Sequence, residues 1–213
     1  MRDTYLTDKV LVMIIGPTAI GKSTVMHEVT RSDSDFSYAR SFTTRPQRSG
    51  ESPTYRHISL REAESLRDSG AAYTYLTHPT TGTVYGTDAL TFVNAYTVLD
   101  TLSDTVDMYR SLPFARTVAI SLTADPEQWE DWLLQRFPTP SKERDQRLRE
   151  ARQSVLWSLG QSSGHSWVSN RPGKPALAAA EIIRIARTSR EAPQAPAEAE
   201  KMLQTIDRLL SYQ

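Results

Sequence analysis

Residues 16–23 read GPTAIGKS and fit the pattern G-x-x-x-x-G-K-[ST]. Glycines at its fixed positions let the backbone curl, so that successive N–H groups point inward and cradle a polyphosphate. The helix after such a loop adds its positive N-terminal end. In this chemistry Lys22 reaches the β- and γ-phosphates of a nucleotide and the Ser23 hydroxyl ligates Mg²⁺. The residues expected to line this triphosphate site are Gly16, Thr18, Ala19, Gly21, Lys22, Ser23 and Thr24.

The flanking residues supply the context that this motif requires. A continuous apolar run rich in β-branched residues, 10–15, precedes the loop and is typical of a strand buried on both faces. Val25, Met26 and Val29 follow it at helical spacing. Strand, glycine loop and helix in this order favour a true P-loop over a chance match in an ordinary strand-to-helix turn.

A second anion site is indicated by Arg45 and Arg48, which lie three residues apart in the turn-rich segment 43–51. An arginine fork binds phosphate through two parallel hydrogen bonds. Arginine pairs on solvated loops are common and carry little meaning alone. The P-loop elsewhere in the chain tips the interpretation toward phosphate binding.

Two further features lie where a phosphate site would need charge. Asp100 ends the buried-strand pattern 96–100, where a P-loop protein binds ligand and metal, although capping of a following helix is an equal alternative. The segment 136–152 is densely basic. It is either a solvated helix face or a lid whose arginines neutralise a phosphoryl group in transfer.

Composition narrows the class of protein. The chain has 213 residues, of which 38% are hydrophobic, enough for a sizeable core. Lys plus Arg and Asp plus Glu both number 25, so no net charge draws it to nucleic acid or membrane. It has no cysteine, which excludes disulfides and thiolate chemistry. We see no signal peptide and no apolar run near the ~20 residues of a membrane span, and so expect a cytoplasmic protein.

Apolar runs and helical patterns alternate along the chain, which predicts an α/β fold with a parallel sheet core. Strands are expected at 10–15, 36–42, 55–58, 71–77, 84–87, 96–100, 117–122 and 167–170. Helices are expected after the P-loop, after a capping box at Ser59 and Glu62, from near Asp88 to Ala95, after Asp125, and over 176–188. A linker at 191–196 leads to a C-terminal helix that docks on the domain, on a twin chain or on another partner.

Four stretches, in order, resemble the guanylate kinase family of P-loop nucleoside monophosphate kinases. They are the P-loop, the segment SFTTRPQRSGE at 41–51, the triplet YGT at 85–87, and Arg136 with Arg147. The resemblance covers roughly residues 10–188. It implies that the acceptor phosphate is held by Ser41, Arg45, Arg48, Tyr55, Tyr85 and Thr87, with Asp100 nearby. It implies that Arg136 and Arg147 clamp ATP phosphates and that Asn170 lies near the adenine.

The chain departs from this family where the base is read. The family's guanine-reading glutamate is replaced by Leu76, and no acid lies between Asp68 and Asp88. The family's acid-x-Asp strand end keeps only its first acid, Asp100, because Leu102 follows. An unpaired buried donor costs about 1–3 kcal/mol, so base discrimination should weaken roughly tenfold or more. The acceptors we expect are (d)GMP, another nucleotide, or a larger or modified acceptor.

We therefore expect a P-loop NTPase three-layer fold over residues 1–190, with an acceptor-binding insertion near 36–87 and an arginine lid near 136–150. The expected reaction transfers the ATP γ-phosphoryl group to a nucleoside monophosphate with Mg²⁺, using Lys22, Arg136 and Arg147. One alternative is a kinase for a sugar phosphate or a nucleotide in nucleic acid. Another is an inactive interaction module. The string GPTA at 16–19 also resembles the start of tRNA prenyltransferases, but segment 43–51 has no place in that class of enzyme. The sequence leaves open whether the chain forms a homodimer.

Overall fold

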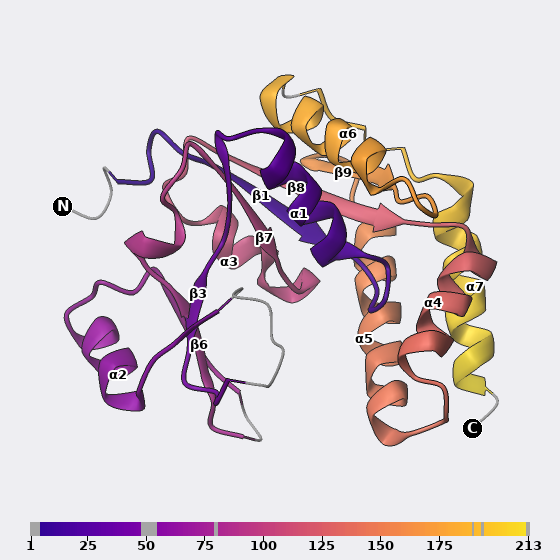
Figure 1. The fold of residues 1–213 in the computed structure, drawn as a ribbon, viewed down its shortest axis with the longest axis horizontal. Coiled ribbons are helices and arrows are strands. Elements are labelled where there is room, and N and C mark those ends of the chain that lie inside the picture. Colours follow the sequence, from indigo (N-terminus) through magenta and orange to yellow (C-terminus); the bar gives the residue numbers. More distant parts are fainter. Residues whose placement is uncertain (1–4, 48–54, 79–80, 189, 193, 212–213) are drawn as a thin grey trace.

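The computed structural model describes residues 5–47, 55–78, 81–188, 190–192 and 194–211. Its core is a five-stranded sheet of order β2-β7-β1-β8-β9 in which every pair of neighbours is parallel (Figure 1). The strands are β1 (Val10–Ile15), β2 (Phe36–Tyr38), β7 (Tyr96–Asp100), β8 (Arg116–Thr123) and β9 (His165–Ser169). The expected α/β class with a parallel core is confirmed.

Strand β1 is buried on both faces, as its uninterrupted apolar sequence predicts. Leu11 and Met13 point into one hydrophobic cluster, and Val12 and Ile14 into another, because side chains alternate along a strand. The Val12 side is covered by α1 (Lys22–Ser32), α4 (Pro126–Arg136), α6 (Pro175–Thr188) and α7 (Ala197–Ser211). The Leu11 side is covered by α3 (Val106–Arg110), while α5 (Lys142–Leu159) adds side chains to both. The result is three layers.

A second sheet, of order β4-β3-β6-β5, stands apart from the first (Figure 1). Its strands are β3 (Ser41–Thr43), β4 (Tyr55–His57), β5 (Thr74–Thr77) and β6 (Val84–Thr87). Helix α2 (Leu60–Asp68) packs Ala63 against Phe42 and Val84 on one face of this sheet. We call residues 41–87 the insertion.

Two local expectations are wrong. The single strand expected over 36–42 is two strands, because β2 pairs with β7 in the core sheet and β3 pairs in the second sheet. Residues 36–38 thus belong to the core sheet, and the second sheet begins at Ser41. The helix expected over 88–95 is only the 3₁₀ turn η1 (Ala89–Thr91). Asp88 and Thr91 close a capping box on that single turn, and Phe92 then leaves helical geometry.

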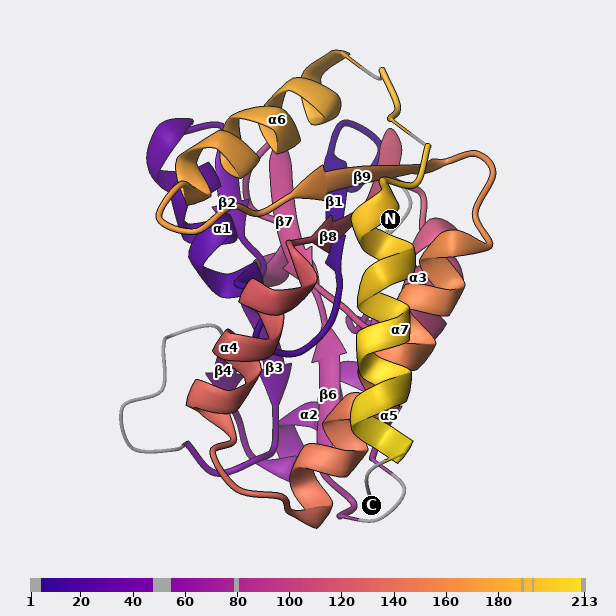
Figure 2. The same ribbon diagram turned by 90° about the vertical axis from the view of Figure 1, so that its right-hand side faces the viewer.

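The C-terminal helix α7 docks on its own chain. It lies alongside α4 and α5 (Figure 2), and its Met202, Ile206 and Leu209 join the hydrophobic cluster that those two helices share. The backbone N–H of Ala124 donates to the Met202 Sδ at 3.4 Å. Of the three docking places left open by the sequence, the structure shows the first, the domain itself.

Between β7 and α3 lies one further 3₁₀ turn, η2 (Ser103–Thr105). Within the described ranges, no helix is both long and apolar enough to cross a bilayer.

Candidate nucleotide-binding cleft

The P-loop lies at the carboxyl end of β1. At this point of the sheet, the connections from two neighbouring strands run to opposite sides. From β1 the chain runs through α1 to β2 on one side, whereas from the neighbouring β8 it runs through α4 and α5 to β9 on the other side. Helices that leave adjacent parallel strands in opposite directions open a crevice at the strand ends. Loop 16–21 occupies this crevice, as Figure 1 shows at the start of α1.

Positive φ angles shape the loop. Gly16 has φ 149° and Gly21 has φ 88°, both in the region that glycine tolerates. Ala19 has φ 64° and is, among the described residues, the one non-glycine with a positive φ. Such a conformation costs of order 1 kcal/mol and persists only where the surroundings hold it.

Two buried side chains hold the loop from beneath. The Trp129 Nε1–H donates to the Thr18 carbonyl at 2.9 Å, and the Asn170 amide Nδ2 donates to the Ile20 carbonyl at 2.9 Å. A Cβ on Gly21 would lie 2.5 Å from that Asn170 nitrogen. Asn170 is therefore packed against the loop backbone, and its expected place near the adenine stays a prediction. The loop is therefore held by a residue of α4 and by the residue that directly follows β9.

Lys22, the first residue of α1, lies across the loop. Its Nζ donates to the Gly16 carbonyl at 2.8 Å and to the Pro17 carbonyl at 3.2 Å, and it lies 3.8 Å from Asp100 Oδ1. The exposed Ser23 and Thr24 follow at the helix N-terminus. The ammonium group therefore lies against the loop backbone and beside the carboxylate at the end of β7.

Asp100 faces the P-loop lysine from the carboxyl end of β7. Of the two roles left open by the sequence, helix capping is excluded because Leu102 precedes η2 without a side-chain cap. Burial in the cleft raises the pKa of the Asp100 carboxyl, and the positive charges of Lys22 and Arg136 oppose that rise. Because its side chain is 42% exposed, water limits the effect of burial.

The second sheet presents a hydroxyl-rich face away from α2. Cross-strand partners share a face of a sheet, and the pairs here are Ser41 with Tyr55, Thr43 with Tyr85 and with His57, Leu76 with Tyr85, and Thr74 with Thr87. The opposite face carries Phe42 and Val84 against α2. The register therefore brings together four predicted acceptor residues: Ser41, Tyr55, Tyr85 and Thr87.

Arg45 joins this face from the end of β3. Its guanidinium lies 5.8 Å from the centroid of the Tyr55 ring, and the rings of Tyr55 and Tyr85 meet edge to face at 5.9 Å. Its Nη1 donates to the Pro46 carbonyl at 3.0 Å. Arg48 lies outside the described residues. Leu76, where the family's glutamate was expected, is 40% exposed and shares its row with Tyr85.

Two tyrosines that sequence reasoning missed connect the two halves of the cleft. Burial and the negative charge of Asp100 raise the pKa of Tyr38, at the end of β2. Tyr55 adds to this rise, whereas the Ser23 hydroxyl opposes it. Burial raises the pKa of Tyr109 to about 12, with the Thr74 hydroxyl opposing the rise. Both phenols thus keep their protons at neutral pH. The local sequence around either tyrosine gave no signal of this placement.

The two expected lid arginines come from different helices. Arg136 ends α4, and its charge acts on the Asp100 carboxyl across the cleft. Arg147 lies on α5 and pairs with Glu150 of the same helix at 2.8 Å. In this structure the Arg136 guanidinium lies 5.6 Å from the centroid of the Phe137 ring, and Arg147 is engaged on its own helix.

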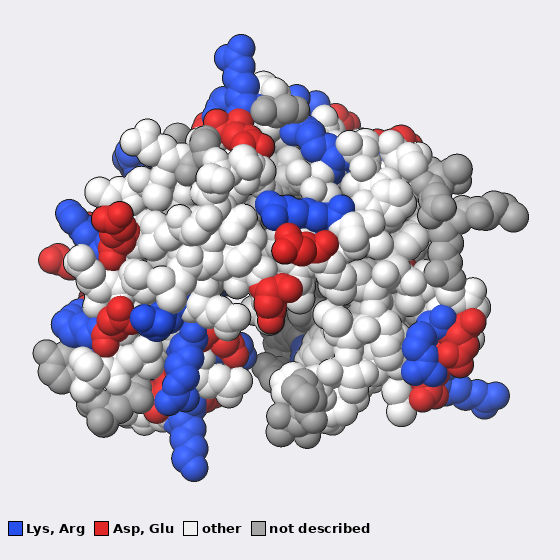
Figure 3. All heavy atoms as spheres, turned by 180° about the vertical axis from the view of Figure 1, so that it is seen from behind, with Lys and Arg blue, Asp and Glu red and all other residues white. Residues whose placement is uncertain are grey.

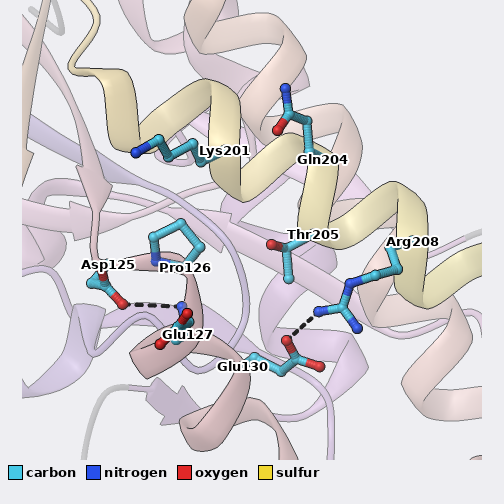
Figure 4. Close-up of a pocket in the computed structure, with 8 residues that line it drawn as sticks. All are labelled: Asp125, Pro126, Glu127, Glu130, Lys201, Gln204, Thr205 and Arg208. Atoms are coloured by element: carbon cyan, nitrogen blue, oxygen red, sulfur yellow. Dashed lines mark hydrogen bonds and ion pairs between the residues drawn. The ribbon is translucent and has the colours of Figure 1, made fainter.

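A hollow of about 440 Å³ lies elsewhere, between α4 and α7 (Figure 4). Its walls come from Asp125, Pro126, Glu127, Glu130, Lys201, Gln204, Thr205 and Arg208. Figure 4 shows Arg208 turned toward Glu130, with which it pairs, and Asp125 turned toward the start of α4, which it caps. No P-loop residue lines this hollow, so it is separate from the cleft.

A parallel sheet with a glycine loop between β1 and α1, a lysine at the end of that loop and a facing carboxylate define a P-loop nucleotide-binding protein. No protein-family model matches the chain. Guanylate kinases of Streptococcus pyogenes serotypes M3 and M18 are 29% identical to it over 192 residues, covering 84% of this chain and 85% of theirs. The guanylate kinase structure from Anaplasma phagocytophilum is 16% identical, covers 85% of both chains and gives a TM-score of 0.48. The chain is thus similar in sequence to guanylate kinases over most of its length.

Proposed function

We propose that this protein is an ATP-dependent phosphotransferase that transfers the γ-phosphoryl group of ATP to the phosphate of a (deoxy)nucleoside monophosphate such as (d)GMP. One observation carries the proposal: the chain holds two groups of phosphate-binding residues. Lys22 of the P-loop lies 3.8 Å from the Asp100 carboxylate, and the register of the second sheet puts Ser41, Tyr55 and Tyr85 on one face. Two phosphate sites that face one cleft are what in-line transfer between two phosphates requires.

The donor side would be held by the chain's own cations and amides. Lys22 and the N–H groups of loop 16–23 bind the β- and γ-phosphates. Mg²⁺ is usually held by one or two protein oxygens plus substrate phosphates. The exposed Ser23 hydroxyl and the Asp100 carboxylate beside Lys22 fit that donor set. Such an ion would neutralise negative charge on the phosphates.

The acceptor side would be held by Arg45, Tyr55 and Tyr85, with Ser41 and Thr87 on the same face. Arg48 is proposed to join them from outside the described residues. Arg136, and Arg147 once it leaves Glu150, would stabilise charge on the transferring group. Because Leu76 offers no hydrogen-bond acceptor, we propose that base selection is weaker than phosphate selection.

The other acceptors have less support. A nucleotide within nucleic acid would call for a broad basic surface. Figure 3 shows one face of the molecule, and there Lys and Arg side chains lie interleaved with Asp and Glu. The sequence similarity to guanylate kinases favours a free nucleotide over a sugar phosphate or an inactive interaction module.

The test is ATP-dependent phosphorylation of a panel of monophosphates: GMP, dGMP, AMP, dAMP, UMP, CMP and dTMP. We expect diphosphate formation with at least one of them. Lys22→Ala should lower kcat/KM about 100-fold or more, since the lysine charge acts on the transferring phosphoryl group. Lys174→Ala, which changes an exposed lysine at the start of the α6 region, is the matched control and should keep wild-type turnover.

Two results would refute the proposal. One is turnover in Lys22→Ala equal to that of the control. The other is a folded wild-type protein that transfers no phosphoryl group to any member of the panel.

A further inference from the structure

The insertion is joined to the core by two stretches of chain. The first is Ala39–Arg40, between β2 and β3, and the second starts at Asp88, directly after β6. Any swing of the insertion relative to the P-loop must bend the backbone at these two crossings. Contacts made there decide how firmly the acceptor face is aligned with the donor site.

One side chain binds both crossings. The Arg56 Nε–H, from β4, donates to the Arg40 carbonyl at 3.2 Å, and the Arg56 Nη2 donates to Asp88 Oδ1 at 2.6 Å. The Asp88 side chain is 6% exposed and that of Arg56 is 21% exposed. A charge-assisted bond of this length in such a buried place is among the stronger contacts that side chains make.

Asp88 in turn fixes the backbone of the second crossing. Its Oδ1 accepts from the Leu90 N–H at 3.0 Å and from the Thr91 hydroxyl at 3.3 Å. Its own N–H donates to the Thr91 hydroxyl at 3.1 Å. The carboxylate that Arg56 binds is therefore the group that holds η1 in place.

Arg56 also stands next to the acceptor face. Successive residues of a strand point to opposite faces, so Tyr55 turns to the hydroxyl-rich side while Arg56, paired with Phe42, turns away from it. Tyr55 is one of the acceptor residues and contacts Tyr85 and Arg45. Tethering Arg56 to both crossings thus positions the strand that carries Tyr55.

We infer that Arg56 and Asp88 form a latch that aligns the acceptor face of the insertion with the P-loop, so that Arg56 is a positioning residue for phosphoryl transfer. The inference builds on the proposed function. Neither side chain belongs to the donor or acceptor set. Their effect on transfer passes through the geometry of the two crossings.

The first arm of the test is kinetic. Arg56→Met keeps the aliphatic stem and removes the guanidinium. We expect it to raise the acceptor KM and lower kcat, by about tenfold in kcat/KM for the acceptor, with the KM for ATP unchanged. Arg56→Lys, which can still bind Asp88, should recover part of the loss. The matched control is Arg110→Met, since Arg110 likewise binds a carboxylate, Asp107, and a backbone carbonyl, that of Gly164, away from the insertion.

A second variant separates alignment from stability. Arg56→Met alone leaves a buried carboxylate without its partner, which is strongly destabilising. The double variant Arg56→Met/Asp88→Asn removes that charge and keeps an N-cap oxygen. We expect the thermal midpoint to recover while the acceptor KM stays raised. Recovery of both quantities together would overturn the latch, because the single variant would then act only through stability.

The second arm does not depend on turnover. Amide hydrogen exchange in the protein without substrates should quicken about tenfold at residues 39–40 and 88–92 in Arg56→Met, and stay unchanged there in Arg110→Met. Unchanged exchange at both crossings would overturn the latch even if kinetics changed. A wild-type protein that phosphorylates no acceptor yet shows the exchange difference would refute the proposed reaction and leave the latch standing.

Discussion

Two glycines of the cleft are explained by the atoms next to them. A Cβ on Gly86, in the triplet 85–87, would lie 2.2 Å from Phe42 Cζ and 2.5 Å from the Thr74 carbonyl oxygen. A Cβ on Gly21 would lie 2.5 Å from Asn170 Nδ2. The first glycine lets β6 pass close to its neighbours, and the second lets the P-loop close over Asn170. Both serve close backbone approach, which no other residue allows.

Gly21→Ala should weaken ATP binding about tenfold or more, because the new methyl group displaces Asn170 and with it the Ile20 carbonyl. Gly82→Ala is the matched control: Gly82 also has a positive φ, +67°, but a Cβ there meets nothing within 4 Å. The control should lose roughly 1–2 kcal/mol of stability and bind ATP as the wild type does. Titration with a fluorescent ATP analogue measures the ATP affinity of both variants. Equal affinity in the two would contradict the role of Asn170.

Helix α7 ties together α4 and α5, the two helices that carry the proposed lid arginines. Asp207 pairs with Arg152 of α5 at 2.6 Å, and Arg208 pairs with Glu130 of α4. These exposed pairs contribute little energy, about 0–1 kcal/mol each. The apolar stripe of α7 contributes more, since Met202 and Ile206 are fully buried against the same cluster as Leu133 and Leu148. At this scale α7 is part of the core.

Ile206→Ala should lower the free energy of unfolding by about 2–5 kcal/mol, the usual cost of emptying a buried aliphatic site. Gln204→Ala, on the exposed side of the same helix, should change it by less than about 0.5 kcal/mol. Urea unfolding followed by circular dichroism measures the difference. If Ile206→Ala unfolded at the wild-type midpoint, α7 would have to melt separately from the domain.

Stability of the whole molecule should depend on one buried imidazole. His165 of β9 is 1% exposed, and its Nε2 lies 2.8 Å from the Ser121 hydroxyl. Burial, with the nearby charge of Arg110, lowers the pKa of His165 from 6.5 to about 4. Between about pH 4 and pH 6.5, His165 is therefore protonated in the unfolded chain and neutral in the folded chain.

The free energy of unfolding should thus fall as pH decreases from 6.5 to about 4, by up to roughly 3 kcal/mol from this residue, and be unaffected by it above pH 6.5. Denaturant titrations at pH 7.5 and 4.5 measure the loss. In His165→Gln the loss between these pH values should shrink. An equal loss in both proteins would assign the acid sensitivity to other groups.

Local patterns predicted the elements whose signals are local. The capping box of Ser59 and Glu62 starts α2, and Asp125 with Pro126 starts α4, both as expected. The patterns were wrong over 36–42, because strand propensity does not say which sheet a strand joins. Arg56 and Tyr38 were missed for a similar reason. Arg56 acts through Asp88, 32 residues away, and no spacing rule brings such pairs together.

The insertion has a consequence for how such a molecule diversifies. It leaves the core after Arg40 and returns at Asp88, two points that a single arginine side chain spans. A module attached through neighbouring entry and exit points can be exchanged without rethreading the sheet that surrounds it. Under the proposed function, the scaffold around the P-loop and the part proposed to bind the acceptor could therefore change independently. Leu76, on β5 of the insertion, pairs with Tyr85 and lies outside the loop around Lys22, so it is the position where we expect such a change to alter selectivity.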